Sequence, residues 1–222
     1  MSKKQALFAA LLSCLISAAA CGGGGSQTND YDAGGEGKAK ADVKKGVKPE
    51  PDAEAAVIEV VSGTDSYGTI VIELYPNIAP KMVERFKTLA REGFYNGTAF
   101  HRVEPEVIQG GDPNSKNDDP FDDGGGDSPY PDLPAEFSDI PYEPGVVGAA
   151  RTNDVNTANC QFFITLARVP RWDNQYTVFG RVIKGLGDAR IISGAPTRAG
   201  SKNPDPKIVM KSVALQPRAN FQ

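Results

Sequence analysis

Residues 94–103 read Phe-Tyr-Asn-Gly-Thr-Ala-Phe-His-Arg-Val, and residues 107–113 read Val-Ile-Gln-Gly-Gly-Asp-Pro. The aromatic and β-branched residues in these two segments predict short strands at Ala99–Val103 and Val107–Gln109. The first segment also carries His101, the only histidine of the sequence, directly before an arginine. The stretch therefore combines strand-forming sequence with polar side chains that can serve a functional site.

The sequence on both sides of this stretch predicts a mainly β domain. Alternation over Ile70–Leu74 is typical of a strand packed on one face. An apolar stripe behind an N-terminal proline predicts a helix at Pro80–Glu92, and a shorter helix is expected at about Leu186–Ser193. Further strands are expected at Val57–Val61, Gly145–Ala150, Gln161–Leu166, Thr177–Ile183 and Lys207–Leu215. About eight strands and two helices in roughly 160 residues favour a closed or nearly closed antiparallel barrel capped by helices.

The composition excludes several classes of function. The chain has 222 residues, 40% of them hydrophobic and 23% charged, which is an ordinary globular mixture. Its formal net charge of −4 argues against nucleic acid as the main partner. One histidine and three cysteines leave little material for a His/Cys zinc site, a Ser-His-Asp triad or a disulfide framework.

The N-terminus has the pattern of a secretory signal peptide over residues 1–20. Lys3 and Lys4 precede an apolar run that ends in Ala-Ala-Ala before Cys21. The run is too short for a comfortable membrane span, and the alanines before Cys21 resemble a bacterial lipobox. We therefore expect lipidation at Cys21 and a lipid-anchored location in the cell envelope. Ordinary secretion, or processing at Cys14, are the alternatives.

Residues 21–55 are expected to form a flexible tether. They are rich in glycine and in interleaved charges and have almost no large apolar residue. A segment of this length would reach roughly 30 Å, enough to hold a domain clear of a membrane. The globular domain is then expected at residues 56–217.

Several segments, taken in order, resemble the cyclophilins, a family of peptidyl-prolyl cis-trans isomerases. The resemblance covers about Val57 to Leu215 and is carried by Tyr67–Pro76, Phe94–Val103, Ile108–Pro113, Gln161–Thr165 and Tyr176–Val182. It implies an eight-stranded antiparallel closed barrel capped by two α-helices. It also implies a monomer that acts on proline-containing polypeptides without a metal or a cofactor.

The resemblance assigns the central catalytic role to Arg102. An X–Pro amide rotates slowly because resonance gives its C–N bond partial double-bond character. The family's arginine stabilises the twisted amide, in which the prolyl nitrogen regains its lone pair. A guanidinium keeps its charge at all accessible pH values and offers a rigid fork of donors, which suits this role.

The resemblance also implies a set of substrate-binding residues. Gln109 matches a glutamine that hydrogen-bonds the substrate backbone, and Phe163 matches an aromatic wall of the proline pocket. Ala150 and Arg151 match an edge where the substrate backbone docks. His101 is expected to be a packed, hydrogen-bonded neighbour of the arginine rather than a base. The complete substrate-binding set is His101, Val107, Gln109, Ala150, Arg151, Gln161, Phe163, Trp172 and Tyr176.

The sequence departs from the family pattern at two places. The spacing between Arg102 and Gln109 is one residue shorter than usual, so a pocket phenylalanine is missing and Val107 takes the position beside it. Without a gap, Arg171 stands at the position of a family tryptophan and Trp172 walls the pocket, which predicts poor sensitivity to cyclosporin. A one-residue gap would restore the tryptophan.

Two functions remain open from the sequence. The first is an active isomerase that assists folding of envelope proteins. The second is a catalytically weak module that binds proline-containing segments, an alternative that the shortened spacing keeps open. An acidic loop over residues 112–136 is expected to be a solvated flap, with weak calcium binding as its alternative. We assign no metal site.

Overall fold

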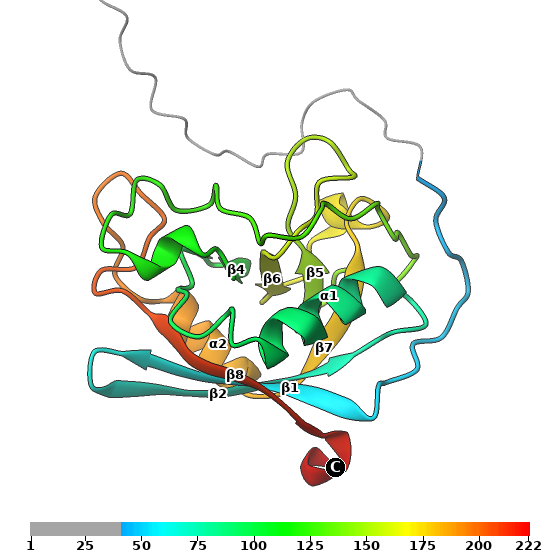
Figure 1. Cartoon of the computed structure of the whole chain (residues 1–222), viewed down its shortest axis with the longest axis horizontal. Coiled ribbons are helices and arrows are strands. Elements are labelled where there is room, and N and C mark those ends of the chain that lie inside the picture. Colours follow the sequence, from blue (N-terminus) through cyan, green and yellow to red (C-terminus); the bar gives the residue numbers. More distant parts are fainter. Residues whose placement is uncertain (1–40) are drawn as a thin grey trace, which may run out of the picture. The chain divides into compact units, whose positions relative to one another are not determined.

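Eight strands form one antiparallel sheet in the computed structural model, which describes residues 41–222 (Figure 1). The two helices are α1 (Pro80–Arg91) and α2 (Leu186–Ser193). Three short 3-10 helices are η1 (Asn114–Lys116), η2 (Pro170–Trp172) and η3 (Arg218–Phe221). The strands are β1 (Glu54–Ser62), β2 (Asp65–Leu74), β3 (Arg102–Glu104), β4 (Val107–Gly110), β5 (Val146–Ala149), β6 (Phe162–Thr165), β7 (Val178–Lys184) and β8 (Val209–Pro217).

The sheet is an open half-barrel, so the expectation of a closed barrel is wrong. Its strand order is β3-β4-β6-β5-β7-β2-β1-β8, which leaves β3 and β8 as the two ends. The outer edge of β3 contacts a loop instead of a strand, because the Val103 amide donates to the carbonyl of Lys202 (2.9 Å). The chain before β3 is joined to β8 by an isolated bridge between Ala99 and Val209 and by hydrogen bonds of Gly97 and Thr98 with Met210, and not by a continuous strand ladder.

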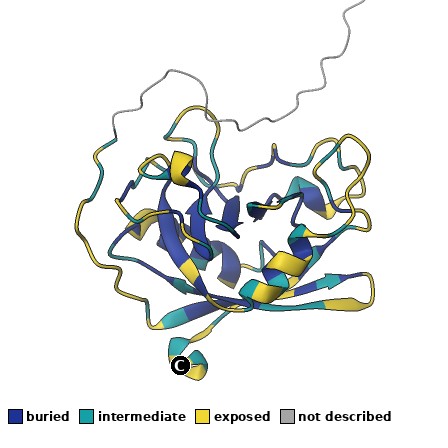
Figure 2. Cartoon of the chain, turned by 180° about the vertical axis from the view of Figure 1, so that it is seen from behind, coloured by how far each residue is buried: buried dark blue, intermediate teal, exposed yellow. Residues whose placement is uncertain are grey.

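The core lies between the concave face of the sheet and the helices. Strand alternation directs Ile70, Ile72 and Leu74 inward, where all three are fully buried. The apolar stripe of α1 adds Phe86, whose ring contacts that of Phe162 edge to face at 5.5 Å between centroids. Figure 2 shows the dark blue, buried strands of this half-barrel.

A second apolar cluster lies on the opposite face of the same strands. Phe163 follows Phe162 in β6 and therefore points away from the core. It packs with Tyr142, Trp172 and Tyr176, all of them buried. This outer aromatic cluster forms one side of the pocket described below.

The predicted helices and strands are all present, with two larger differences in their bounds: β2 begins at Asp65 rather than at Ile70, and the strand near residue 100 is shorter. The second helix has the predicted bounds, and the first ends one residue earlier than predicted. The strand expected at Ala99–Val103 begins only at Arg102, because the preceding residues bond to the start of β8, with the Phe100 amide donating to the Ile208 carbonyl (3.0 Å). No helix within residues 41–222 has the length and apolar character needed to cross a membrane.

The described end of the expected tether lies against the domain. The Lys44 amide donates to the carbonyl of Phe137 (2.9 Å), and the Lys44 ammonium donates to the carbonyl of Ile78 (2.6 Å). The Asp52 amide donates to the carbonyl of Leu74 (2.8 Å). The ordered domain thus begins before residue 56, which corrects the expected boundary. The expected signal peptide and Cys21 lie outside the described residues.

Candidate active site

A pocket opens where the β3–β4 hairpin meets β6 and the segments around residues 150 and 172. It encloses about 320 Å³, including the solvent-filled space at its mouth. Eight of the ten predicted site residues in the domain line it: Arg102, Val107, Gln109, Ala150, Arg151, Phe163, Trp172 and Tyr176. The fold therefore gathers residues that are up to 74 positions apart in the sequence. Their roles toward a substrate remain predictions.

The short spacing between Arg102 and Gln109 is absorbed in a tight turn. The two residues are directly paired across the β3–β4 ladder, and Glu104 pairs with Val107. Only Pro105 and the residue after it lie between the strands. Paired residues on neighbouring strands point to the same face, with Cβ atoms about 5 Å apart. The missing residue therefore shortens the turn and leaves Arg102 opposite Gln109, while Val107 still reaches the pocket.

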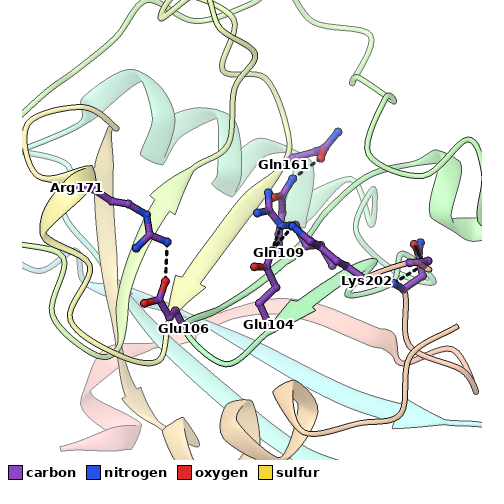
Figure 3. A network of polar contacts seen from close by, with 9 residues as sticks. Glu104, Glu106, Gln109, Gln161, Arg171 and Lys202 are labelled. Carbon is purple, nitrogen blue, oxygen red and sulfur yellow. Dashed lines mark hydrogen bonds and ion pairs between the residues drawn. The ribbon is translucent and has the colours of Figure 1, made fainter. Parts of the chain in front are cut away.

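Arg102 is held by a carboxylate that the sequence did not single out. Its Nε lies 2.5 Å from Glu104 Oε1, and the Lys202 ammonium lies 3.1 Å from the same oxygen (Figure 3). Burial by itself would raise the pKa of Glu104, but the hydrogen bonds and charges of Arg102 and Lys202 lower it. Glu104 is thus an anion that bridges two cations at the edge of the pocket.

Two buried side-chain amides connect the pocket to the loop that contains three consecutive glycines, residues 124–126, called the glycine-rich loop below. Gln109 Nε2 donates to Gln161 Oε1 (3.1 Å), as Figure 3 shows, and Gln161 Nε2 donates to the carbonyls of Gly124 and Gly126 (3.0 Å each). Gln161 does not line the pocket. It accepts a hydrogen bond from the Gln109 amide and thereby orients that side chain, and its expected contact with the substrate stays a prediction.

The buried carboxylate of Asp112 holds the glycine-rich loop in place. Asp112 accepts hydrogen bonds from the amides of Gly124 and Asn114. A Cβ atom at Gly126 would lie 2.2 Å from Asp112 Oδ1, so glycine is needed there for close approach. Within residues 41–222, no group of three or more His, Cys, Asp and Glu side chains is arranged to hold a metal ion.

Aromatic rings form the wall of the pocket opposite the hairpin. The ring of Phe163 lies 4.9 Å from that of Trp172 and 5.6 Å from that of Tyr176, measured between centroids. Trp172 lines the pocket, while Arg171 is exposed and pairs with Glu106 (2.6 Å). Both sequence matches, with and without a gap, place Trp172 at the pocket, so the choice between them stays open. The rings of Phe163, Trp172 and Tyr176 thus give the pocket an apolar wall.

Arg151 brings a second guanidinium to the rim. Its Cζ lies 4.4 Å from the centre of the Tyr176 ring, and its two terminal nitrogens donate to the carbonyls of Thr152 (2.7 Å) and Gln175 (2.9 Å). A cation above an aromatic face is attracted by the ring quadrupole, so this side chain is fixed in place. Arg151 therefore supports the aromatic wall as well as lining the pocket.

His101 does not reach the pocket. Its side chain is buried, and neither ring nitrogen makes a hydrogen bond of ordinary geometry. Burial lowers the pKa of His101 to about 4; the charge of Arg102 acts in the same direction, and Asp112 opposes it. The ring is thus neutral near pH 7. It is close enough to Arg102 to be affected by its charge, as expected, but the expected hydrogen bonds are absent and the side chain does not line the pocket.

The cysteine of the domain is a buried structural residue. Cys160 is fully buried, and burial raises the pKa of its thiol to about 12, with the nearby charges of Asp127 and Asp112 acting in the same direction. A thiol in this state is a poor nucleophile. We therefore assign no chemical role to Cys160, which does not line the pocket.

An arginine set against an apolar wall, on the outer face of an eight-stranded half-barrel with two helices, is the arrangement of a prolyl isomerase. Residues 58–215 match the family model described as "Cyclophilin type peptidyl-prolyl cis-trans isomerase/CLD". The chain belongs to this family, and it is a peptidyl-prolyl cis-trans isomerase (EC 5.2.1.8).

Relatives and solved structures of the same family are similar to the chain. The probable peptidyl-prolyl cis-trans isomerase of Brucella suis biovar 1 (strain 1330) is 46% identical over 153 residues, which cover 66% of this chain and 78% of that protein. The Schizosaccharomyces pombe isomerase ppi1 is 40% identical, with 68% and 95% covered. The Cryptosporidium parvum cyclophilin-type isomerase, crystallised in the presence of the dipeptide Ala-Pro, has a TM-score of 0.64 and 27% identity, with 73% and 98% covered.

Proposed function

We propose that the chain accelerates rotation of X–Pro bonds by holding the Arg102 guanidinium against the twisted amide. The observation that carries the proposal is that Arg102 and the aromatic residues Phe163 and Trp172 line one pocket. The pocket thus offers a cation and an apolar wall for a pyrrolidine ring within one site. The Ala-Pro dipeptide of the Cryptosporidium parvum crystals supports proline-containing peptides as the substrate class.

The proposed mechanism needs no proton transfer and no covalent step. Rotation about the C–N bond breaks amide resonance, which contributes most of a barrier of about 18–20 kcal/mol. In the twisted state the prolyl nitrogen carries a lone pair, and a donor directed at it lowers the energy of that state relative to both planar isomers. Each 1.36 kcal/mol of such preference gives about a tenfold rate increase.

The other side chains hold the substrate while it rotates. The rings of Phe163, Trp172 and Tyr176 pack around the proline, which fixes one side of the bond. Gln109 and the edge at Ala150 and Arg151 bind the backbone on the other side. The groups on both sides of the X–Pro bond are then held in place, and only the bond itself rotates. Positioning of this kind lowers the entropy cost of reaching the twisted state.

A protease-coupled isomerisation assay on Suc-Ala-Xaa-Pro-Phe-type peptides tests this proposal. Arg102→Ala should lower kcat/KM by about 100-fold or more, the usual loss when a preorganised electrostatic donor is removed. Arg102→Lys, which keeps the charge but loses the fork of donors, should lie in between. Equal and negligible rates for the wild-type and Arg102→Ala proteins would support the alternative, a module that binds proline-containing segments without useful turnover.

We further propose that the protein is a monomer that works in the cell envelope, anchored by lipid at Cys21, and assists folding of envelope proteins. Support comes from the signal pattern of residues 1–20 and the alanines before Cys21. Cys21→Ser should move the protein from the detergent fraction to the soluble fraction. Unchanged fractionation would remove the lipid anchor from the proposal. Poor sensitivity to cyclosporin, expected from the match without a gap, stays a prediction that inhibition titration of the purified domain tests.

A further inference from the structure

Glu104 is a charged residue beside the proposed catalytic arginine, and it belongs neither to the apolar core nor to the pocket lining. Glu104 ends β3 and does not line the pocket. Its carboxylate nevertheless contacts the guanidinium of Arg102, two residues before it, at 2.5 Å. Residues two apart on a strand point to the same face, so the contact is built into the strand geometry.

The contact engages one edge of the guanidinium and leaves the others available. Glu104 accepts from Nε, the single N–H of Arg102 that lies nearest to the side-chain stem. A guanidinium has five N–H donors, so four remain on the terminal nitrogens, which belong to a side chain that lines the pocket. An unrestrained arginine loses rotamer freedom when it binds a ligand, and this bond removes part of that freedom in advance.

A second cation keeps the carboxylate from cancelling the charge of the arginine. The Lys202 ammonium lies 3.1 Å from the same oxygen of Glu104, and the Lys202 carbonyl accepts from the amide of Val103, which fixes the backbone of this loop beside β3. The three side chains together carry a formal charge of +1. The pocket edge therefore stays positive although its arginine is paired.

We propose that Glu104 is a positioning residue that orients the Arg102 guanidinium toward the pocket, and that Lys202 preserves the positive charge of the pair. The inference rests on the proposed role of Arg102. It names a residue that acts through the arginine without touching the substrate, and a long-range partner, Lys202, that acts through Glu104.

Three hairpin variants test the proposal by separating catalysis from binding. Glu104→Ala should lower kcat of the isomerase by about tenfold, while peptide affinity, followed by the fluorescence of Trp172, stays within twofold of wild type. Glu104→Gln keeps an oxygen that accepts from Nε and should recover activity to within about threefold of wild type. Glu106→Ala is the matched control, because it removes a carboxylate from the same hairpin that pairs with Arg171 outside the pocket and should leave activity unchanged.

A double-mutant cycle tests the part played by Lys202. Lys202→Ala should reduce kcat by about two- to threefold in the wild-type chain and have no further effect in the Glu104→Ala chain, since it acts through the carboxylate. Additive losses would overturn the role of Lys202.

The outcomes also separate this inference from the proposed function. If Arg102→Ala abolishes activity and Glu104→Ala is as active as wild type or more active, the positioning role is overturned and the proposed function stands. If activity and peptide affinity fall together in Glu104→Ala, Glu104 is structural and the inference is again overturned. If Arg102→Ala is fully active, the proposed function itself fails.

Discussion

Strands β4 and β6 have one face in the core and one face at the pocket, and residues adjacent in the sequence belong to different faces. On the inner face, Ile108 and Phe162 are fully buried in the core. On the outer face, Gln109 and Phe163 line the pocket. The inner face contains only apolar contacts between closely packed groups, whereas the outer face combines rings, amides and a cation beside solvent. We therefore expect the inner face to contribute more to folding stability, and the outer face to contribute less to stability but more to activity.

The largest expected effect comes from truncating the two adjacent phenylalanines. Phe162→Ala leaves a cavity between β6 and α1 and should lower the free energy of unfolding by about 3–5 kcal/mol. Phe163→Ala opens a wall that already borders solvent, so we expect a loss of about 2 kcal/mol but a fall of at least tenfold in kcat/KM.

Urea unfolding and the coupled isomerase assay measure the two quantities. Phe162→Leu serves as a second variant of the inner face if Phe162→Ala does not fold, and it should keep most of the activity. Equal losses of stability and activity for both positions would show that the two faces are not functionally distinct.

Trp172, the only tryptophan of the sequence, provides a fluorescence signal from the pocket. Because its ring lines the pocket, a bound proline peptide should change its fluorescence in a saturable manner. Trp172→Phe keeps an apolar wall and should lower kcat/KM by less than tenfold while removing the optical signal. A peptide lacking proline is the control, and an equal response to both peptides would place the emission change outside the pocket.

His101 provides a test on the buried side of the hairpin. Burial lowers its pKa to about 4, below its ordinary value of 6.5, so the unfolded chain takes up a proton that the folded chain refuses between these values. Stability should therefore fall as the pH drops from about 6.5 to 4, by on the order of 2–3 kcal/mol. The imidazole signals of this single histidine, followed by NMR, should titrate near pH 4. A midpoint near 6.5 would contradict the buried, neutral ring.

The smallest effect is expected at Asp123 in the loop beside the pocket. Burial raises its pKa to about 6; the charges of Asp112 and Asp122 add to the rise, and Lys207 and a hydrogen bond from Asn203 oppose it. Since the folded-state pKa exceeds the ordinary value of 3.8, stability from this group is greatest at low pH and is lost as the pH rises through about 6.

Asp123→Asn removes that ionisation. The group is half exposed, so solvent screening leaves a gain of only about 1 kcal/mol at pH 8 and almost none at pH 4. Thermal unfolding should show the gain as a rise in Tm of about 2–4 °C. A variant that is equally stabilised at both pH values would exclude the ionisation as the cause.

The sequence predicts the helices, most strands and the pocket residues because their information is local. Alternation identified β2 and separated Phe162 from Phe163, and the apolar stripe identified α1. The ordered family motifs then located Arg102, Gln109 and the aromatic wall. These features depend on residues that are near one another in the chain.

The features that the sequence did not reveal depend on contacts between distant segments. Lys202 reaches Glu104 from a loop almost one hundred residues away, and nothing in its neighbourhood distinguishes it from a solvated lysine. Lys44 was placed in a tether because its surroundings are polar, although its ammonium bonds a main-chain carbonyl. The open edge of the sheet was missed because a loop carbonyl, at Lys202, replaces a strand.

The position of β3 at the end of the sheet also sets how the arginine can move. One neighbouring strand and a single amide of Val103 restrain this segment, whereas β6 lies between two strands. Local opening is easiest where the fewest hydrogen bonds must break. Hydrogen–deuterium exchange should therefore be faster in β3 than in β6, so the strand that carries the arginine is expected to open locally before the strand that carries the aromatic wall.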